Sequence, residues 1–592
     1  MAAVDRFTVE VLRNAFASIV DEMGVMISRC AMSPVITQGK DFSGAVMTSD
    51  GELVMQGALV LPGHVGTMSF TIEAILEDFG EDVQPGDVFA TNDPHRAGTH
   101  LSDIRIVKPI FANGELLAFV INCGHFTDVG GAVPGSFVAS AKDSMSEGLL
   151  MPPVKFVREG KLSQEILNIF LYNCRLPDLN RGDLLALVAS VDLGERRFAD
   201  LVEKYGADTI EAMFADHLAS NEQALRDLIA GLPDGEYEVT DFIDQDPGRN
   251  TDEPIRCHLR MAIDGDSLTL DFTGSDNAAR GAVNATLPVT TSGVVVALKC
   301  LFANEVEICA GINRAITIET TPGSIFHALW PAPTSGMSGS SFQKAVDLVF
   351  GCFAQVVPER AMACPATETN YVQAGDDPRE DSLFDEYILY CWTEGGYGAR
   401  RESDNGTYIT LFASGSMNQS VELYEQLYPI YWQRMELIPD SGGAGRRRGG
   451  LGDLRRVSLE YGESATLSSF GDRERFPAWG LDGGGFGRNQ GFVVNAGTSD
   501  EVSIGVMTTG YEVTRGDFWD YWSGGGGGFG DPLEREPELV LEDVKDGYVT
   551  VDGARRDYGV VVNAAGLRYD DWSIDHAATK ERRAYVRSGA GD

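Results

Sequence analysis

The stretch from residue 104 to residue 122 constrains this chain most, because it predicts which distant residues must meet. Two apolar runs flank the pair Asn113-Gly114, and this pair is typical of the tight turn of a β-hairpin. With the turn centred on these two residues, the register of the hairpin places His125 opposite Ser102. The hairpin therefore brings together two polar clusters that the chain separates.

Two histidines and a carboxylate are predicted to converge at the open end of this hairpin. His100 and Asp103 lie within two positions of Ser102, and residues near each other across a ladder are within side-chain reach. Histidine and carboxylate ligands without cysteine suit Zn, Mn or Fe(II). The alternative interpretation is turn residues and satisfied polar groups at strand ends, but the matched position of His125 favours one divalent metal or a catalytic site.

A second hairpin brings a further carboxylate and a further histidine to an open end. Its turn is Asp50-Gly51, another pair that is typical of hairpins. The register of this hairpin places Asp41 opposite Val60, and His64 follows just beyond. The pattern leaves open whether the ends of the two hairpins face each other.

The rest of the chain alternates between helical and strand patterns, which predicts a mixed α+β fold. Residues 8–32 have the spacing of an amphipathic helix that Thr8 could cap, and residues 160–232 are largely helical. From residue 236 the pattern is that of a sheet, and glycine becomes abundant from residue 394. We expect a helix-and-hairpin N-terminal metal-binding part, a central α+β part, and a β-rich, Gly-rich C-terminal part. The expected parts are residues 1–235, 236–435 and 436–592.

The glycine-rich runs lack known nucleotide-binding motifs. None is followed by Gly-Lys-Ser/Thr as in a Walker A loop, and none has the strand-to-helix context of a dinucleotide fingerprint. Arg446, Arg447 and Arg448 lie among these glycines and could hold a phosphate or carboxylate, although internal salt bridges are the favoured interpretation. Another Gly/Pro stretch, residues 129–137, is either a wall or lid beside His125 or a plain connector.

The charge balance excludes several classes of function. The chain has 88 Asp and Glu residues against 47 Lys and Arg residues, a net charge of −41, which repels nucleic acid and anionic membranes. Its apolar runs are shorter than a membrane span, and charged residues interrupt any N-terminal secretory pattern. Nine scattered cysteines without a Cys-x-x-Cys pair are typical of reduced thiols. We expect a cytoplasmic protein that binds neither nucleic acid nor membranes.

Several separate motifs, in the right order, resemble one known family. The motifs are Asp41-Phe42-Ser43, Gly63-His64-Val65-Gly66, Asn92-Asp93-Pro94, Gly98-Thr99-His100-Leu101-Ser102-Asp103, Gly442-Gly443-Ala444-Gly445-Arg446, Arg448-Gly449-Gly450-Leu451-Gly452 and Gly530-Asp531-Pro532. The chain resembles the hydantoinase B family nearly end to end. This family includes the B subunits of ATP-dependent hydantoinases, the C-terminal half of 5-oxoprolinase, the beta subunit of caprolactamase, and the metal-bearing subunits of acetone and acetophenone carboxylases.

The resemblance implies a division of labour between two subunits. A partner A-type subunit, of the actin and sugar-kinase-like fold, would bind ATP with Mg and phosphorylate the oxygen of an amide or enolate. The B-type chain would receive this intermediate and complete hydrolysis or carboxylation at a metal. The metal ligands that the resemblance implies are Asp41, His100, Asp103 and His125. The hairpin argument reaches the last three independently.

The leading hypothesis is ATP-dependent hydrolysis of a cyclic amide, a hydantoin or a lactam, within a hetero-oligomer. His64 or Asp128 could act as the base, and His95, where many family members have Tyr, could contact the phosphate. A plain structural role is the alternative for each of these three residues. The runner-up hypothesis is ATP-dependent carboxylation of a ketone. A non-catalytic scaffold ranks last, because closed structural metal sites more often use cysteine.

Overall fold

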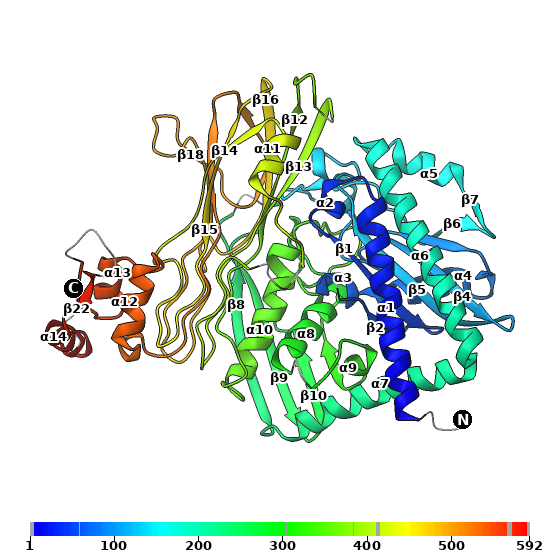
Figure 1. Cartoon of the computed structure of the whole chain (residues 1–592), viewed down its shortest axis with the longest axis horizontal. Helices are drawn as coiled ribbons and strands as arrows, with labels where there is room; N and C mark the ends of the chain where they lie inside the picture. The colour runs from blue at the N-terminus through cyan, green and yellow to red at the C-terminus, as the bar shows by residue number, and fades with distance from the viewer. Residues whose placement is uncertain are drawn as a thin grey trace.

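The computed structural model shows a mixed α+β protein with several antiparallel sheets (Figure 1), which confirms the expected fold class. The division into three parts stays a prediction, and its second boundary falls within β14 (Ile430–Leu437). The residues that the structure describes are 5–58, 60–249, 251–302, 305–382, 384–409, 412, 415–564 and 571–588.

The N-terminal part is built on one seven-stranded sheet. Its strand order is β2-β1-β5-β4-β3-β6-β7, and every neighbouring pair is antiparallel. The two predicted hairpins, β1–β2 and β4–β5, are both present and lie next to each other in this sheet. The strands are β1 (Phe42–Thr48), β2 (Leu53–Gln56), β3 (Val88–Thr91), β4 (Asp103–Ala112), β5 (Glu115–His125), β6 (Val154–Arg158) and β7 (Lys161–Leu162).

The hairpin of β4 and β5 differs from its prediction by one residue at the open end. Next to the turn, the ladder has the register that the Asn-Gly pair sets. A β-bulge directly after Ile110 shifts the ladder, so that Asp103 rather than Ser102 faces His125. The predicted pairing of His125 with Ser102 is therefore wrong. The bulge places two candidate ligands directly opposite each other.

The second hairpin also forms, but Asp41 does not face Val60. Strand β2 ends at Gln56, so Val60 lies beyond the ladder. On its other side β1 pairs with β5, and the backbone N–H of His125 donates to the carbonyl oxygen of Asp41 at 3.0 Å. The open ends of the two hairpins are thus neighbours, which the sequence pattern left undecided.

Helices cover both faces of this sheet (Figure 1). Helices α1 and α6 pack together on one face, α1 over β1 and β2 and α6 over β4 and β5, while α4 packs on the opposite face. The predicted helical region that ends near residue 232 is confirmed as three helices. The helices of this part are α1 (Arg6–Cys30), α2 (Pro34–Thr37), α3 (Pro62–Val65), α4 (Met68–Phe79), α5 (Gln164–Leu171), α6 (Pro177–Tyr205) and α7 (Ala207–Ala230).

Helix α1 begins two residues earlier than predicted because a different residue caps it. The side chain of Asp5 accepts hydrogen bonds from the backbone N–H groups of Phe7 and Thr8, so Asp5 rather than Thr8 is the N-cap. The apolar face of the helix is buried as its spacing predicts, and each such side chain contributes roughly 1.5–3 kcal/mol of transfer free energy. The buried residues of this face include Leu12, Phe16, Ile19 and Met23.

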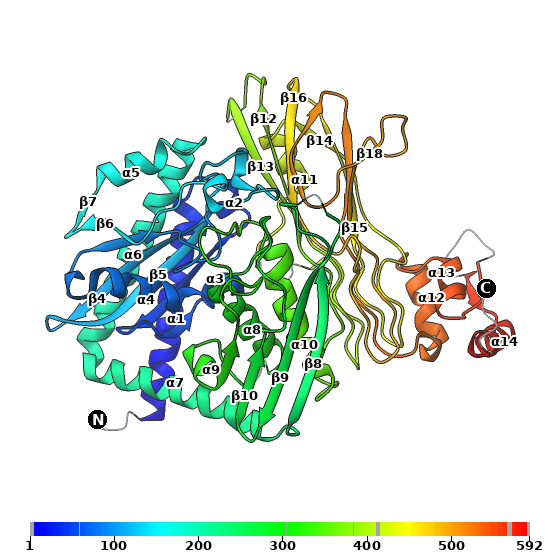
Figure 2. The same ribbon diagram turned by 180° about the vertical axis from the view of Figure 1, so that it is seen from behind.

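The central part is a four-stranded sheet with two buried helices against it (Figure 2). Helices α8 (Leu287–Leu301) and α10 (Gln343–Ala354) pack together. A π-helical turn, Ser338–Phe342, leads directly into α10, and such turns are frequent at functional sites. The remaining elements are β8 (Gly235–Ile243), β9 (Ile255–Asp264), β10 (Ser267–Asp271), β11 (Ile316–Glu319) and α9 (Ala310–Arg314).

Two further antiparallel sheets form a sandwich with an aromatic core. Their strand orders are β13-β12-β16-β19 and β14-β15-β20-β17-β18. Tyr371, Phe492, Trp519 and Tyr521 are all buried between them. The elements are β12 (Thr369–Asp376), β13 (Glu386–Thr393), α11 (Val421–Leu427), β15 (Asp453–Leu459), β16 (Ser464–Phe470), β17 (Gly491–Val494), β18 (Val502–Ser503), β19 (Thr508–Thr514) and β20 (Phe518–Trp522).

The glycine-rich runs pack as extended chains in direct backbone contact. They run side by side from the sandwich toward the C-terminal helices (Figure 1). The N–H of Gly526 donates to the carbonyl of Gly450 at 3.0 Å, and the N–H of Gly443 donates to the carbonyl of Gly526 at 2.8 Å. A Cβ on Gly449 would lie 2.0 Å from the carbonyl oxygen of Gly526, so only glycine permits this approach.

A small helical unit closes the C-terminal end and uses one of the predicted arginines. Arg448 Nε lies 3.3 Å from Asp543, and Arg535 bridges Asp543 and Asp404 at 2.7 Å each. The salt-bridge interpretation of Arg448 is therefore confirmed. The elements of this unit are α12 (Pro537–Lys545), α13 (Val551–Asp557), β21 (Val562–Asn563), β22 (Ser573–Ile574) and α14 (His576–Arg587).

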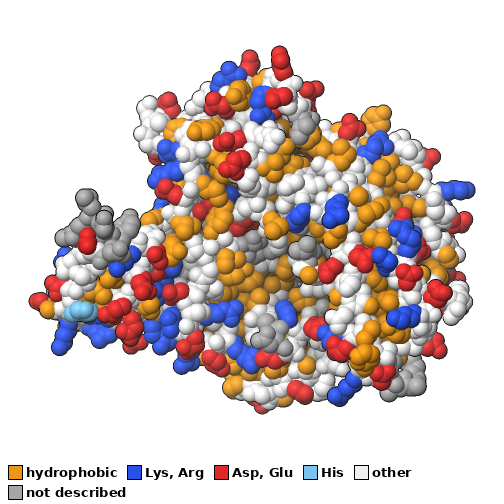
Figure 3. Space-filling model, in the orientation of Figure 1, with side chains coloured by type: hydrophobic (Ala, Val, Ile, Leu, Met, Phe, Trp, Pro, Cys, Tyr) orange, Lys and Arg blue, Asp and Glu red, His pale blue; other side chains and the backbone are white. Residues whose placement is uncertain are grey.

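The described surface mixes charges in spite of the large net charge. Acidic and basic side chains are interspersed over the face shown in Figure 3, with hydrophobic side chains between them. Among the described helices, none has the length and apolar character needed to cross a bilayer.

Candidate metal centre

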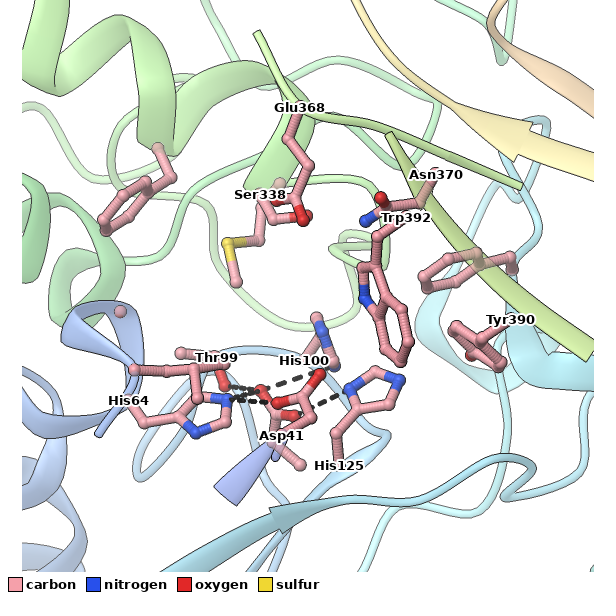
Figure 4. Close-up of a pocket in the computed structure, with 16 residues that line it drawn as sticks. Asp41, His64, Thr99, His100, His125, Ser338, Glu368, Asn370, Tyr390 and Trp392 are labelled. Atoms are coloured by element: carbon pink, nitrogen blue, oxygen red, sulfur yellow. Dashed lines mark hydrogen bonds and ion pairs between the residues drawn. The ribbon is translucent and has the colours of Figure 1, made fainter. Parts of the chain in front are cut away.

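A buried pocket lies where the open ends of the two hairpins meet the central part and the sandwich (Figure 4). Its floor comes from β1, β4, β5 and α3, and its opposite wall from the π-helical turn and strands β12 and β13. The residues that line it are Asp41, Leu61, Gly63, His64, Thr99, His100, Asp103, His125, Phe137, Met337, Ser338, Phe342, Glu368, Asn370, Tyr390 and Trp392.

Asp103 lies at the centre of the polar floor and is fully buried. Its Oδ1 lies 3.0 Å from His125 Nδ1, across the ladder. Its Oδ2 lies 3.2 Å from His64 Nε2 and 3.6 Å from His100 Nδ1, and Thr99 donates its hydroxyl to the same oxygen. One carboxylate therefore lies within hydrogen-bond distance of two imidazole rings and close to a third.

Local geometry explains why these side chains converge. The backbone N–H of Asp103 donates to the carbonyl of His100 at 3.1 Å, and this turn directs both side chains into the pocket. His64 lies in the short helix α3, where its Nδ1 is 3.3 Å from the hydroxyl of Ser43. Asp41 precedes β1, and its Oδ1 is 4.0 Å from His64 Nε2.

Three buried atoms of the floor lack any hydrogen-bond partner among the described residues. They are Asp41 Oδ1, His100 Nδ1 and His125 Nε2. A buried polar atom without a partner costs about 1–3 kcal/mol, so this arrangement calls for a ligand. The ligand atoms of His100, Asp103 and His125 lie within 4.8 Å of one another. The residues present thus fit one divalent cation held by histidine and carboxylate.

A second group of possible ligand atoms shares Asp103 with the first. His64, Asp103 and Cys123 also lie within 4.8 Å of one another, and all three are buried. Cys123 is a β5 residue that faces Arg105 across the ladder. His64 therefore has both a thiol and the central carboxylate close to its ring.

Burial and neighbouring charges set the protonation of the floor. Burial lowers the pKa of His100 to about 4, so its imidazole is neutral at pH 7, as a metal ligand requires. Burial alone would raise the pKa of Asp103, but the charges of His100 and His64 hold it well below its ordinary value. Burial raises the pKa of Asp41.

Two of the three predicted catalytic residues, Asp128 and His95, lie away from the lining of this pocket. Asp128 is buried and accepts from the backbone N–H groups of Gly130 and Gly135 at 3.0 Å each, and Arg175 pairs with it at 2.8 Å. These contacts fix the loop at 129–137, whose last residue, Phe137, lines the pocket. The loop is therefore part of the wall rather than a plain connector.

His95 is also held outside the pocket lining. Its Nε2 lies 3.0 Å from the carbonyl oxygen of Ala332, and its Nδ1 lies 3.8 Å from Asp93. Its ring meets the edge of Trp330 at a centroid distance of 5.7 Å. His64 is thus the one of the three predicted catalytic residues that lines the pocket beside the predicted metal ligands.

The opposite wall of the pocket was not predicted from the sequence. It includes Glu368, Asn370, Tyr390 and Trp392, which reach the site from the sandwich, more than two hundred residues along the chain from His125. None of these residues belongs to a motif with metal-ligand or catalytic spacing. The only local signal is a carboxylate directly before a strand of mixed polar and apolar residues, and such a residue is usually exposed.

Known proteins match this chain nearly from end to end. Residues 5–532 match the family described as Hydantoinase B/oxoprolinase. The chain belongs to the hydantoinase B/oxoprolinase family. The resemblance that the sequence motifs carry is therefore confirmed.

Members of this family that resemble the chain span its whole length. The caprolactamase beta subunit of Pseudomonas jessenii is 30% identical over 593 residues, covering 99% of this chain and 100% of that protein. An uncharacterized protein of Methanocaldococcus jannaschii is 33% identical over 584 residues, covering 98% of this chain and 100% of that protein. This hydantoinase B/oxoprolinase family member thus belongs to an enzyme family that includes subunits of amide hydrolases.

Solved structures share the fold. The crystal structure of the ATP-dependent caprolactamase of Pseudomonas jessenii matches with a TM-score of 0.87 and 29% identity, covering 98% of this chain and 100% of that chain. A nucleotide-free acetone carboxylase structure matches with a TM-score of 0.89, covering 99% of this chain and 83% of that chain, but at 21% identity. The second likeness concerns the fold alone.

Proposed function

We propose that this chain is the metal-bearing B-type subunit of an ATP-dependent hydrolase of cyclic amides, a hydantoinase or lactamase. The observation that carries the proposal is the buried floor of the pocket, where the side chains of Asp41, His100 and His125 each have an atom without a partner. The likeness to the caprolactamase beta subunit over nearly the whole chain supports an amide as the substrate. In this proposal, Asp41, His100, Asp103 and His125 hold one divalent metal, Zn, Mn or Fe.

The proposed division of labour follows from the chemistry of the amide. Resonance makes the amide carbon a poor electrophile. Phosphorylation of the amide oxygen removes this resonance and makes the carbon more electrophilic. The A-type partner subunit would bind ATP-Mg and catalyse this phosphorylation. This assignment fits the lack of a Walker A motif in this chain. The activated ring would then enter the pocket of this chain. The working assembly is a cytoplasmic hetero-oligomer without nucleic acid.

The residues of the floor have distinct proposed roles. A divalent metal, when bound there, supplies a hydroxide near neutral pH. His64 lines the pocket 3.2 Å from Asp103, so we assign proton transfer at the attacking water to His64 Nε2. Asp128 fixes the loop that carries Phe137, and we assign it a positioning role. The Nε2 of His95 lies within hydrogen-bond distance of the carbonyl oxygen of Ala332. We assign His95 a role in guiding the phosphate of the intermediate toward the pocket, and no role at the reacting atoms.

Elemental analysis of the purified chain tests the site. We expect about one Zn, Mn or Fe per chain in the wild type, and its loss in both His100→Ala and His125→Ala, because each variant removes a ligand. His258→Ala is a matched control, because His258 bonds Thr240 in the central sheet instead. A folded wild type without metal, or full metal content in both variants, would contradict the assignment.

Product analysis separates the two candidate reactions. Wild-type chain, A-type partner, ATP and a hydantoin or lactam should yield the ring-opened acid. The runner-up, carboxylation of a ketone, predicts that label from bicarbonate enters the product. The fold is shared with an acetone carboxylase, so fold similarity does not distinguish the two reactions. Incorporation of label without amide hydrolysis would replace the proposal by its alternative.

A further inference from the structure

The wall opposite the metal ligands carries a carboxyl group that the proposed chemistry leaves unused. Glu368 lies directly before β12, is 5% exposed, and lines the pocket. In Figure 4 its side chain lies across the pocket from His64 and Asp41. A ring bound between the two sides would therefore have the metal ligands on one side and this carboxyl group on the other.

Among the described residues that line the pocket, Glu368 is the one acid without another assignment. The other titratable residues of the lining are the four proposed metal ligands, His64, which is assigned to the attacking water, and Tyr390. The hydroxyl of Tyr390 donates to the carbonyl oxygen of Gly135 at 2.6 Å. Ser338 and the indole N–H of Trp392 can donate hydrogen bonds, but neither group gives up its proton near neutral pH.

The surroundings of Glu368 favour its protonated form. Burial raises its pKa from 4.5 to about 7, and the negative charges of Asp41 and Glu394 act in the same direction. A hydrogen bond from Asn370 and the charge of His125 act in the opposite direction on this pKa. Among the described residues, no Lys or Arg pairs with Glu368. An acid whose pKa lies near the operating pH is well suited to proton transfer.

The activated ring needs a proton at its nitrogen before it can open. In the proposed function, the ring enters this pocket with a phosphoryl group on its amide oxygen, so its nitrogen carries no hydrogen. Addition of hydroxide to the ring carbon moves an electron pair onto that nitrogen, and two groups can then leave the carbon. Departure of phosphate, by cleavage of the C–O bond, restores the amide and consumes ATP without opening the ring. Cleavage of the C–N bond opens it.

We infer that Glu368 is the general acid that protonates the ring nitrogen and thereby directs the reaction to ring opening. The inference rests on the proposed function and assigns a further catalytic residue of the same pocket. His64 and Glu368 then act from opposite sides of the ring, one as the base at the attacking water and one as the acid at the nitrogen. Such a division of roles between two groups in different environments is common in enzymes.

The step balances in atoms and charge. The carboxyl proton of Glu368 passes to the ring nitrogen, and the hydrogen of the added hydroxyl group becomes the second hydrogen of the departing amine. The C–N bond breaks as the C=O bond forms, which leaves an amine and an acyl phosphate. Water hydrolyses the acyl phosphate to the acid and phosphate, and the Glu368 carboxylate recovers its proton from water.

The cavity must widen to take the ring between these groups. Its volume is about 40 Å³, which is close to the share of liquid volume of one water molecule, about 30 Å³. Met337 lines the same wall as Glu368, and its side chain is unbranched and has three rotatable bonds. We expect Met337 to move as the ring enters, because hydrogen bonds hold the polar floor in place.

The test counts rings opened per ADP formed. It uses the full, metal-loaded chain with the A-type partner and ATP in ¹⁸O-labelled water, and the probes are hydantoin, 2-pyrrolidinone and caprolactam. Glu368→Gln keeps the shape of the side chain but has no acidic proton, so ring opening should fall by about 10²- to 10⁴-fold. ADP formation should continue. The recovered amide should gain ¹⁸O, because phosphate then leaves in place of the nitrogen and the oxygen of the added hydroxide stays on the carbon.

Two further variants frame this result. Glu368→Asp keeps an acid on a shorter side chain, so it should open more rings per ADP than Glu368→Gln. Asp376→Asn is the matched control, because Asp376 is an exposed carboxylate further along the same strand, and it should keep the ratio of the wild type. Metal content equal to that of the wild type shows in each variant that the floor is intact.

The outcomes separate this inference from the proposed function. An unchanged number of rings opened per ADP in Glu368→Gln overturns the inference and leaves the proposed function standing. A fall in ring opening without ¹⁸O in the recovered amide also overturns it, because Glu368 would then act before hydroxide adds to the carbon. A wild type that opens none of the three rings refutes the proposed function, and this inference with it.

Discussion

Two of the buried clusters of ionisable side chains in the described part of the chain differ in what completes them. In the candidate metal centre, Asp103 lies beside three histidines, and three buried ligand atoms have no hydrogen-bond partner among the described residues. The second cluster also has spacing that could suit a metal ion, between Asp241, Asp347 and Cys364. There, however, Lys344 lies 3.2 Å from Asp241.

The second cluster already contains its cations. Besides Lys344, the guanidinium of Arg473 lies 3.2 Å from Asp241 and pairs with Asp347, and both cations are fully or almost fully buried. Arg473 Nη2 also lies 2.9 Å from the sulfur of Cys364. Spacing of acidic and thiol groups alone therefore does not identify a metal site. A shortage of cations, together with unpartnered ligand atoms, distinguishes the site from the structural cluster.

The largest expected effect concerns Asp103, the residue that joins the three histidines. Asp103→Asn should abolish stoichiometric metal and lower turnover at least about 10³-fold, as removal of an essential group does. The fold should remain, because the side chain keeps its shape. Elemental analysis and the ring-opening assay measure the effect, and circular dichroism checks the fold. A variant with full turnover would show that the central carboxylate is structural, like those of the second cluster.

The next largest effect concerns Lys344. Its replacement should lower the unfolding free energy and leave the metal content unchanged. Lys344→Met leaves Asp241 and Asp472 buried without this cation, and breaking a buried ion pair costs about 3–5 kcal/mol. Denaturant unfolding should show this loss of unfolding free energy, while the metal content of the folded chain stays unchanged. Loss of metal at unchanged stability would reverse the roles that we assign to the two clusters.

A smaller effect is expected at Glu147, a buried carboxyl group that forms no ion pair with any of the described residues. It accepts from the backbone N–H groups of Thr334 and Ser335, and burial raises its pKa from 4.5 to about 7. Because the folded pKa is raised, the stabilising contribution is fully present below pH 4.5 and is lost as pH rises through about 7. The lost contribution is about 3 kcal/mol, since one pKa unit corresponds to about 1.4 kcal/mol.

Unfolding free energies measured between pH 4.5 and pH 8 check this contribution. Glu147→Gln should flatten the decline, because the amide does not titrate. The exposed carboxylate Glu386 provides the control, and Glu386→Gln should leave the slope unchanged. An identical decline in Glu147→Gln and wild type would assign the pH dependence to other buried carboxyl groups.

Much of the candidate metal centre was predictable, because its signals are local. The Asn113-Gly114 and Asp50-Gly51 turns each specify a hairpin through short-range turn chemistry. The amphipathic spacing of α1 likewise predicts its buried face. Sequence patterns alone therefore predicted α1, the helical region that ends near residue 232, the two hairpins and the convergence of His100, Asp103 and His125.

Tertiary structure alone decided how these pieces fit together. The bulge after Ile110, which moves Asp103 opposite His125, depends on packing and not on the turn, and a shift of one residue exchanges the two faces of a strand. The pairing of β1 with β5 and the wall of Glu368 and Asn370 are contacts between distant segments. The glycine runs likewise acquire their role only when several extended chains meet. Turn and helix signals act over a few residues, whereas register and the shape of a shared pocket depend on the packing of the whole chain.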